Sequence, residues 1–189
     1  MIYLLKKEEE DTLDVIFNQV DIKNKLLSSY GQPLFFNWNV ANCKWYKDEE
    51  SEDSKEKDFI LLLGYIPICK SKIIDAFMKE FSSEDIEYLP ILIEDKSYYV
   101  LNILKKYDHL VNIAKSRVDY FSDKSIMWIH EFVFYPRAEV SLMFRVSEIS
   151  SVVFVNEHFK NIYDDNNFKG LDFKKCRIKK RSILNLLFK

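Results

Sequence analysis

The stretch "IEYLPILIEDKSYYVLNILKKYDHL", residues Ile86–Leu110, contains two apolar runs separated by a short polar segment. Ile86–Ile93 is almost continuously apolar, and Tyr98–Leu104 is rich in Tyr, Val, Leu and Ile. Because Glu94–Ser97 has the polarity and length of a turn, the pattern predicts a β-hairpin, although it lacks the stronger Asn-Gly or Asp-Gly signal. Pro90 cannot donate a ladder hydrogen bond, so we expect the first strand to lie at a sheet edge or to be bulged there.

The remaining pattern mixes strands and helices without a regular alternation. Further strands are expected at Ile2–Leu5, Phe59–Ile68, Ser125–Phe134, Val140–Val146 and Gly170–Ile178, the second broken at Gly64 and Pro67. Helical spacing of apolar residues predicts helices over Asp11–Leu27, Ser71–Phe81 and Val155–Asp165, with Ser71 and Asn156 as candidate caps. The order of these elements predicts an α+β fold, with a largely antiparallel sheet flanked by a few helices.

Length and composition indicate one domain. The chain has 189 residues and a 48% hydrophobic fraction, which suffices for a sizeable core. Three Gly and four Pro are too few for a loop-dominated protein. We therefore treat residues 1–189 as a single domain. The N-terminal apolar run is too short for a signal-peptide core, and no stretch approaches a membrane span of roughly 20 residues. These features predict a cytoplasmic protein with no membrane partner.

Charge is unevenly distributed along the chain. The formal net charge is −2, which by itself favours neither nucleic acid nor an anionic membrane as a partner. Residues 47–58, "KDEESEDSKEKD", contain seven acids, three lysines and no apolar residue, which predicts an acidic surface loop. Residues 173–189 contain seven basic side chains and no acid, and residues 177–189 form a basic C-terminal tail in this reading.

Neither a metal site nor a nucleophilic centre is indicated. Cys43, Cys69 and Cys176 are odd in number and have no CxxC spacing, so we expect buried free thiols and no metal or other cofactor. His130-Glu131 lacks the second His of HExxH, because position 134 is Phe. No glycine-rich phosphate loop and no GxSxG motif is present.

Two histidines remain candidates for acid–base chemistry. Asp108-His109 resembles an acid/base pair in a loop, but general acid–base catalysis also needs a pocket and a third group. Neighbouring residues in a strand point to opposite faces, so we favour a structural role for His130. A hydrolase with a dispersed site at His109 or His130 stays open as the weakest hypothesis.

The segment Lys174–Arg181, "KKCRIKKR", is the strongest basic feature. Clustered Lys and Arg bind phosphate backbones by releasing counterions, which would make the protein a nucleic-acid-binding accessory module. Only Phe173 and Phe188 lie near enough in sequence to stack on bases. We favour a solvated basic face and keep nucleic-acid binding as the alternative function.

A set of short motifs between residues 59 and 176 is similar to one known family. These motifs are Leu89-Pro90, the "YYVLN" of Tyr98–Asn102, Ser116, Phe144-Arg145, the "VNEHFK" helix and Gly170-Leu171. In their order and spacing the chain resembles a bacterial family of polymorphic-toxin immunity proteins, the eleventh in the usual immunity-family catalogue. The resemblance covers roughly residues 59–176. Leu89, Pro90, Tyr98, Asn102, Gly170 and Leu171 are architectural positions in this reading, which makes the Ile86–Leu110 hairpin part of the scaffold.

The resemblance implies a small cytoplasmic protein that binds a cognate protein toxin and neutralises it, with no catalysis of its own. An inhibitor acts by occluding a surface, which requires an interface of standard size and no reactive residues. A basic groove on the toxin would suit the acidic loop. The residues we expect to bind the partner are Trp45, Tyr46, Asp48, Glu49, Glu50, Glu52 and Asp53, the first two as aromatic anchors.

Overall fold

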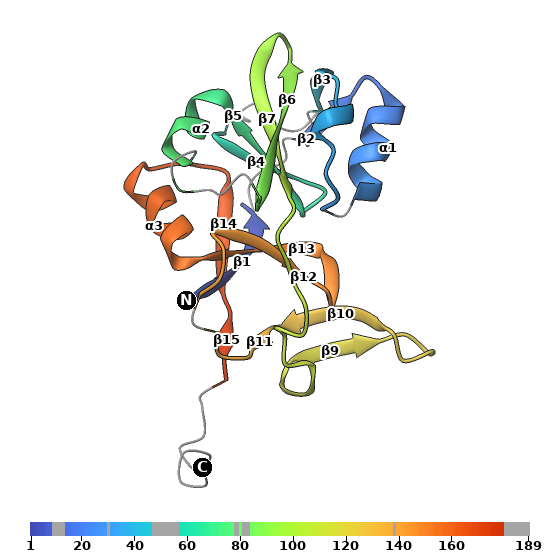
Figure 1. The fold of residues 1–189 in the computed structure, drawn as a ribbon, viewed down its shortest axis with the longest axis vertical. Helices are drawn as coiled ribbons and strands as arrows, with labels where there is room; N and C mark the ends of the chain where they lie inside the picture. The colour runs from blue at the N-terminus through green and yellow to red at the C-terminus, as the bar shows by residue number, and fades with distance from the viewer. Residues whose placement is uncertain are drawn as a thin grey trace, which may run out of the picture.

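Two large β-sheets organise the chain. The computed structural model describes residues 1–8, 14–29, 31–46, 57–77, 80, 84–137 and 139–179. Figure 1 shows a six-stranded sheet at the top and a five-stranded sheet below it, with the helices beside them. The α-helices of the described ranges are α1 (Val20–Ser29), α2 (Ser71–Phe77) and α3 (Glu157–Asp165). Two 3₁₀ turns, η1 (Phe35–Asn37) and η2 (Ile113–Lys115), lie in connections elsewhere in the chain.

The six-stranded sheet has the order β2-β3-β6-β7-β5-β4. Its strands are β2 (Asp14–Phe17), β3 (Ala41–Tyr46), β4 (Phe59–Leu62), β5 (Ile66–Lys70), β6 (Ile86–Ile93) and β7 (Lys96–Ile103). All neighbours are antiparallel except β3 and β6, which are parallel.

The predicted hairpin forms the centre of this sheet. β6 and β7 pair without a register shift from Ile86↔Ile103 to Ile93↔Lys96. The connection is the two-residue turn Glu94-Asp95, and both residues have positive φ angles, 47° and 64°, as a type I′ turn requires. The hairpin prediction is therefore confirmed, with acidic residues in place of the usual Asn-Gly.

The position predicted for Pro90 was wrong. β6 lies between β3 and β7, so it is an interior strand, and no bulge interrupts its pairing with β7. The Pro90 carbonyl accepts a hydrogen bond from Trp38 Nε1 at 2.9 Å, and the pairing with β3 begins only at Ile91. N–H and C=O of one residue point to the same side of a strand, so the missing donor lies on the side where β3 has not yet begun.

Two other predictions of single elements are corrected by the structure. Asp11–Leu27 was expected to be one helix, but Asp14–Phe17 is strand β2 and the helix starts at Val20. β-Branched and aromatic residues favour strands, and the sheet buries Val15 and Phe17 of this segment. Phe59–Ile68 is divided near Gly64, as predicted, into β4 and β5, but the break predicted at Pro67 is wrong, because Pro67 lies inside β5 and pairs with Leu61. Of the predicted helix Ser71–Phe81, residues 71–77 form α2, and residues 78–79 and 81 lie outside the described residues.

The five-stranded sheet has the order β14-β1-β13-β12-β8. Its strands are β1 (Ile2–Lys7), β8 (Lys106–Tyr107), β12 (Met143–Val146), β13 (Ile149–Asn156) and β14 (Leu171–Lys175), antiparallel except for β12 and β8. Two ribbons complete the described β-structure: β9 (Arg117–Tyr120) with β10 (Ile126–Glu131), and β11 (Val133–Phe134) parallel to β15 (Arg177–Ile178).

These elements confirm the predicted class. The fold is α+β with largely antiparallel sheets, and the expected strands near residues 2–5, 125–134, 140–146 and 170–178 are all present. The first extends to Lys7, and the other three are shorter or divided. The helix predicted at Val155–Asp165 is α3, except that Val155 is the penultimate residue of β13.

The core consists of three clusters, and the central one joins the two large sheets. The buried residues of this central cluster are Tyr3, Leu5, Phe59, Leu61, Cys69, Ile73, Ile74, Phe77, Ile86, Leu101, Ile103, Leu142, Met143, Val153, Val155, Phe159, Tyr163 and Leu171. A second cluster lies on the α1 side of the six-stranded sheet, and a third lies on the ribbon side of the five-stranded sheet.

Several strands contribute to two clusters at once. In β1, Tyr3 and Leu5 enter the central cluster while Ile2 and Leu4 enter the third. In β4, Phe59 and Leu61 enter the central cluster while Ile60 and Leu62 enter the second. Successive side chains of a strand point to opposite faces, so continuously apolar strands such as these are buried on both sides.

A buried arginine adds a polar link between the sheets. Arg145 of β12 donates from Nη1 to the Ser150 carbonyl at 2.6 Å and from Nη2 to the Tyr65 carbonyl at 3.1 Å, and Tyr65 lies in the β4–β5 turn. Burial lowers the pKa of the guanidinium to about 10, which leaves it protonated near neutral pH. Arg145 therefore ties the five-stranded sheet to a turn of the six-stranded sheet.

Asn102 also has an architectural role. Its Nδ2 donates to the Gln32 carbonyl and to Glu87 Oε2, both at 2.9 Å. The Glu87 carboxylate also accepts from the amides of Leu34 and Phe35, at 2.8 and 3.1 Å, just before η1. The cross-strand pair of buried Asn102 and partly buried Glu87 anchors the segment between α1 and β3 on the hairpin.

Phe59 of β4 and Gly170, which directly precedes β14, bring the backbones of the two large sheets into contact. The Phe59 ring is fully buried and contacts Phe77, Phe159, Tyr163 and Phe168 with centroid separations of 5.7–6.3 Å. Gly170 has φ +110°, and a Cβ there would overlap the Phe59 carbonyl oxygen. Only glycine fits this close approach of two backbones.

The substitution Gly170→Ala should therefore destabilise the fold far more than Gly64→Ala. Both positions have positive φ, but a Cβ at Gly64 meets no atom within 4 Å. Gly64→Ala should cost roughly 1–2 kcal/mol for the left-handed backbone, and Gly170→Ala on the order of 2 kcal/mol more because of the overlap. Urea unfolding monitored by circular dichroism measures both. Equal losses at the two positions would contradict this packing.

Candidate protein-interaction surface

The β9–β10 ribbon extends away from the two large sheets, at the lower right of Figure 1. Its register runs from Ile126↔Tyr120 to Glu131↔Arg117, with irregularities on both sides of the Trp128–Ile129 segment. Lys124 closes the turn with φ 68°, and its amide donates to the Phe121 carbonyl at 3.0 Å. Bulges increase local twist and aim side chains in new directions.

One set of side chains anchors the ribbon. Ile129 is buried in the third cluster, and Val118 and Ile126 contact that cluster while partly exposed. Lys174 Nζ of β14 donates to the His130 carbonyl at 3.1 Å, which connects the ribbon to the five-stranded sheet. The ribbon is therefore held at its base by apolar contact and a cross-link to β14.

A second set of side chains on the ribbon is left in solvent. Tyr120, Phe121, Met127 and Trp128 are 47–52% exposed, and we call these four residues the hairpin surface. Tyr, Phe, Met and Trp are enriched in protein–protein interfaces, and Trp and Tyr are common hot-spot residues. Four such side chains on one projecting ribbon mark it as the candidate interaction surface.

Most of the charged or titratable side chains on the ribbon contact a polar neighbour within it. Arg117 Nε lies 3.4 Å from Glu131, and His130 Nε2 lies 2.7 Å from Asp119. In the turn, Asp123 accepts from the Ser125 hydroxyl at 2.6 Å and from its amide at 2.9 Å, and these hydrogen bonds lower the pKa of the carboxyl. Because most of these charged side chains already contact a polar neighbour within the ribbon, the ribbon offers apolar contact more than electrostatic attraction.

The residues predicted from sequence lie elsewhere. Tyr46 ends β3 and is 53% exposed, so it remains accessible as an anchor. Trp45 was expected to be exposed but is half-buried: its ring contacts Tyr98 edge-on at 5.7 Å and covers the second cluster. The predicted acids Asp48, Glu49, Glu50, Glu52 and Asp53 lie outside the described residues.

The described part of the acidic segment, Lys57 and Asp58, is held in place by ion pairs. Asp58 lies 3.3 Å from Lys72 and 3.9 Å from Lys70, and Lys57 forms an ion pair with Glu8. Composition predicted a solvated loop over residues 47–58, but its last two residues, Lys57 and Asp58, are partly buried. Side chains from β5 and α2 therefore bind the segment where it enters β4.

The histidine candidates do not converge on a shared site. His130 pairs with Asp119, and His158 pairs with Glu80 at 2.9 Å, both at the surface. His109 is exposed in a loop with φ 55°. Within the described ranges, no group of three or more His, Cys, Asp or Glu side chains gathers where it could hold a metal ion.

The three thiols are buried, as predicted. Cys43, Cys69 and Cys176 are free, and burial raises the pKa of all three, to about 12 for Cys43 and Cys176. A nucleophilic cysteine needs a lowered pKa and access to solvent. The described environment gives these thiols a structural role.

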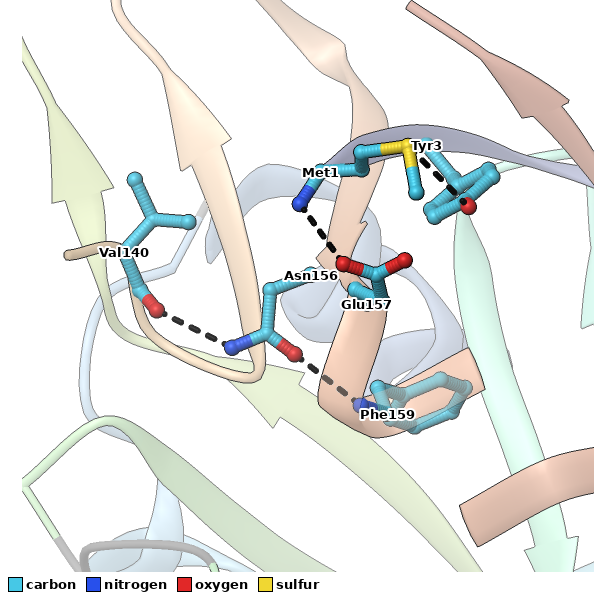
Figure 2. A network of polar contacts seen from close by, with 6 residues as sticks. All are labelled: Met1, Tyr3, Val140, Asn156, Glu157 and Phe159. Carbon is cyan, nitrogen blue, oxygen red and sulfur yellow. Dashed lines mark hydrogen bonds and ion pairs between the residues drawn. The ribbon is translucent and has the colours of Figure 1, made fainter. Parts of the chain in front are cut away.

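A cavity of about 260 Å³ lies beside the N-terminus of α3, and Figure 2 shows the polar contacts that surround it. Asn156 caps the helix, as predicted: its Oδ1 accepts from the Phe159 amide at 2.9 Å, and its Nδ2 donates to the Val140 carbonyl at 3.1 Å. The Met1 ammonium lies 3.3 Å from Glu157. Of the other charged residues that line the cavity, Arg137 donates from Nε to the Glu139 carbonyl at 3.1 Å and His158 pairs with Glu80. These polar groups therefore contact one another or residues outside the cavity.

The basic segment predicted from sequence is largely part of the sheets. Lys174 and Lys175 lie in β14, Arg177 lies in β15, and the Lys179 amide donates to the Phe134 carbonyl at 2.8 Å. Lys180, Arg181 and the rest of the segment lie outside the described residues.

Comparisons with known proteins leave the family open. Neither the protein-family models nor the curated proteins compared with this chain give a match. Of the helices in the described ranges, none combines the length and the apolar character that crossing a bilayer demands.

Sequence reasoning missed the hairpin surface. The segment "VDYFSDKSIMW" (118–128) contains the signal, because its apolar residues flank a polar turn on a short two-stranded unit. Periodicity cannot distinguish a strand that is buried from one left outside the core, so Met127 and Trp128 were predicted only as part of the strand Ser125–Phe134, and Tyr120 and Phe121 were assigned no role.

Trp128 should account for most of the tryptophan quenching by acrylamide. Trp38 and Trp45 are half-buried, whereas the Trp128 side chain is 47% exposed. Trp128→Phe should therefore lower the Stern–Volmer slope, while Trp45→Phe should leave it nearly unchanged. A larger decrease from Trp45→Phe would show that the ribbon is covered by other parts of the chain.

Proposed function

We propose that this protein is an immunity protein that binds a cognate bacterial toxin in the cytoplasm and neutralises it by covering its active site or another functional surface. The observation that carries the proposal is the hairpin surface, four large apolar side chains half-exposed on a projecting ribbon. A ribbon of this kind can enter a concave site, as inhibitors of enzymes do, without taking part in any reaction.

The hairpin surface has the size expected of the centre of an interface. Large side chains bury roughly 150–250 Å² each, so four that are half-exposed offer on the order of 400 Å². Each partner in a standard interface contributes about 800 Å². The remaining area would come from the polar side chains around the four, including Asp119, Lys124 and Glu131, which suits a polar rim.

The absence of reactive clusters among the described residues supports the same proposal. The histidines are paired separately at the surface and the thiols are buried. A binding protein needs no general base, nucleophile or metal, whereas a hydrolase needs several such groups within hydrogen-bond reach.

The acidic segment would contribute mainly to the rate of association. If the toxin is a nuclease, its substrate groove is basic, and Asp48, Glu49, Glu50, Glu52 and Asp53 would attract it. Long-range attraction of this kind raises association rates and weakens with salt. Tyr46 is exposed at the start of this segment and could contact the same partner.

Co-expression with the toxin tests the proposal. The wild-type chain should protect cells, and Tyr120→Ser/Trp128→Ser should lose protection. The loss of two hot-spot side chains, at about 2 kcal/mol each, weakens binding by roughly a thousandfold.

The matched control is Phe36→Ser/Val40→Ser, which also removes two exposed apolar side chains, 95% and 51% exposed, away from the ribbon. Thermal unfolding of both double variants checks that each is folded. Unprotected cells with the wild-type chain would refute the immunity function. Full protection by the ribbon variant would leave immunity intact and remove the hairpin surface from the contact.

A further inference from the structure

A basic groove of about 630 Å³ runs along β15, on residues separate from the hairpin surface. Its basic lining residues are Lys115 at the end of η2, Lys175 at the end of β14, and Arg177 and Lys179 in and after β15. Two parts of the chain far apart in sequence, η2 and the segment formed by β14 and β15, thus bring four cations around one concavity, and none of its lining residues is acidic.

These cations have no acidic partner in the described part of the chain. No ion pair with a described Asp or Glu involves Lys115, Lys175, Arg177 or Lys179. Lys179 instead lies over the Tyr135 ring, with 5.8 Å from its Nζ to the centroid. Four uncompensated positive charges around one groove attract an anionic occupant.

The rest of the lining is apolar. Val133 and Cys176 are buried beneath the cations, and Ile178 is 42% exposed between Arg177 and Lys179. Alternate residues of an extended chain are roughly 6.6 Å apart on one side. An occupant that alternates negative and apolar groups at this spacing would match the lining.

β15 also has a backbone edge available for pairing. The amides of Arg177 and Lys179 donate to the carbonyls of Phe132 and Phe134, so both point toward β11. The N–H and C=O of Ile178 then point to the opposite side, where no described strand pairs with β15. An extended peptide can add to such an edge through main-chain hydrogen bonds.

We propose that this groove is a docking site for an acidic, extended peptide segment of a partner protein, which adds to the β15 edge and pairs its carboxylates with Lys175, Arg177, Lys179 and Lys115. The combination of a strand edge, alternating cations and an apolar floor favours a peptide over nucleic acid. Single-stranded nucleic acid also needs aromatic faces for its bases, and the described lining has none. This surface does not depend on the proposed immunity function.

Fluorescence anisotropy with the full chain tests the site directly. The probe is a short blocked peptide in which glutamate and valine alternate, and the comparison probes are an oligothymidylate of the same length and a lysine–valine peptide. We expect saturable binding of the glutamate–valine peptide at low salt, weaker binding as salt rises, and weaker or no binding of the other two. Lys175→Glu/Arg177→Glu should weaken peptide binding by roughly tenfold or more.

The matched control is Lys23→Glu/Lys44→Glu, which changes the net charge equally at two exposed lysines outside the groove. The double substitution could disturb β15 itself, so a second variant, Lys115→Glu, changes a lining residue on η2 instead. It should also weaken peptide binding. Hydrogen exchange at the Ile178 amide should slow when the peptide binds. The proposal is overturned by an equal loss in the control, by unchanged exchange at Ile178, by absence of saturable peptide binding, or by an oligothymidylate that binds as tightly as the peptide.

Discussion

The whole structure depends on strands that must bury both of their faces. β4, the first four residues of β1 (Ile2–Leu5) and residues 152–155 of β13 are continuously apolar and buried, so each of these strands needs a packed layer above it and another below. One sheet alone could not provide this, and the central cluster solves the problem by serving both large sheets at once. Phe59 lies at its centre, and the close approach of Gly170 to the Phe59 carbonyl lets β14 join the second sheet directly against the first. Arg145 then fixes the two sheets with hydrogen bonds to Tyr65 and Ser150.

The hairpin surface is an exception to this pattern of burial. Apolar side chains are plentiful in this chain, and most of those described are buried in the three clusters. The β9–β10 ribbon is different, because only Ile129 is fully buried while Tyr120, Phe121, Met127 and Trp128 remain half in solvent. Leaving four such side chains outside a core that accommodates so many others costs favourable burial, which a bound partner would recover. The basic groove along β15 is a second surface of opposite character, polar where the ribbon is apolar.

Much of the fold could be predicted from sequence, and the failures have specific physical causes. The β6–β7 hairpin, the cap at Asn156 and the buried thiols follow from local patterns, and the structure confirms them. Pro90 was misplaced because its missing donor is accommodated by the late start of β3, a tertiary feature that no local rule contains. Asp14–Phe17 was predicted to be helical because its apolar spacing over only four residues fits a helix as well as a strand. The site was less predictable: Tyr46 is exposed as expected, Trp45 packs on the second cluster, and the hairpin surface depends on which strands the core leaves uncovered.

The central claim is that the molecule acts by covering another protein with its projecting ribbon. Hydrogen exchange measured by mass spectrometry, on the chain alone and in complex with the protein it retains from its native cells, tests that claim most directly. The account predicts that exchange slows across residues 117–131 in the complex, with little change in the β6–β7 hairpin, which is already protected in the core. A stable complex in which residues 117–131 exchange as fast as in the free chain would contradict it.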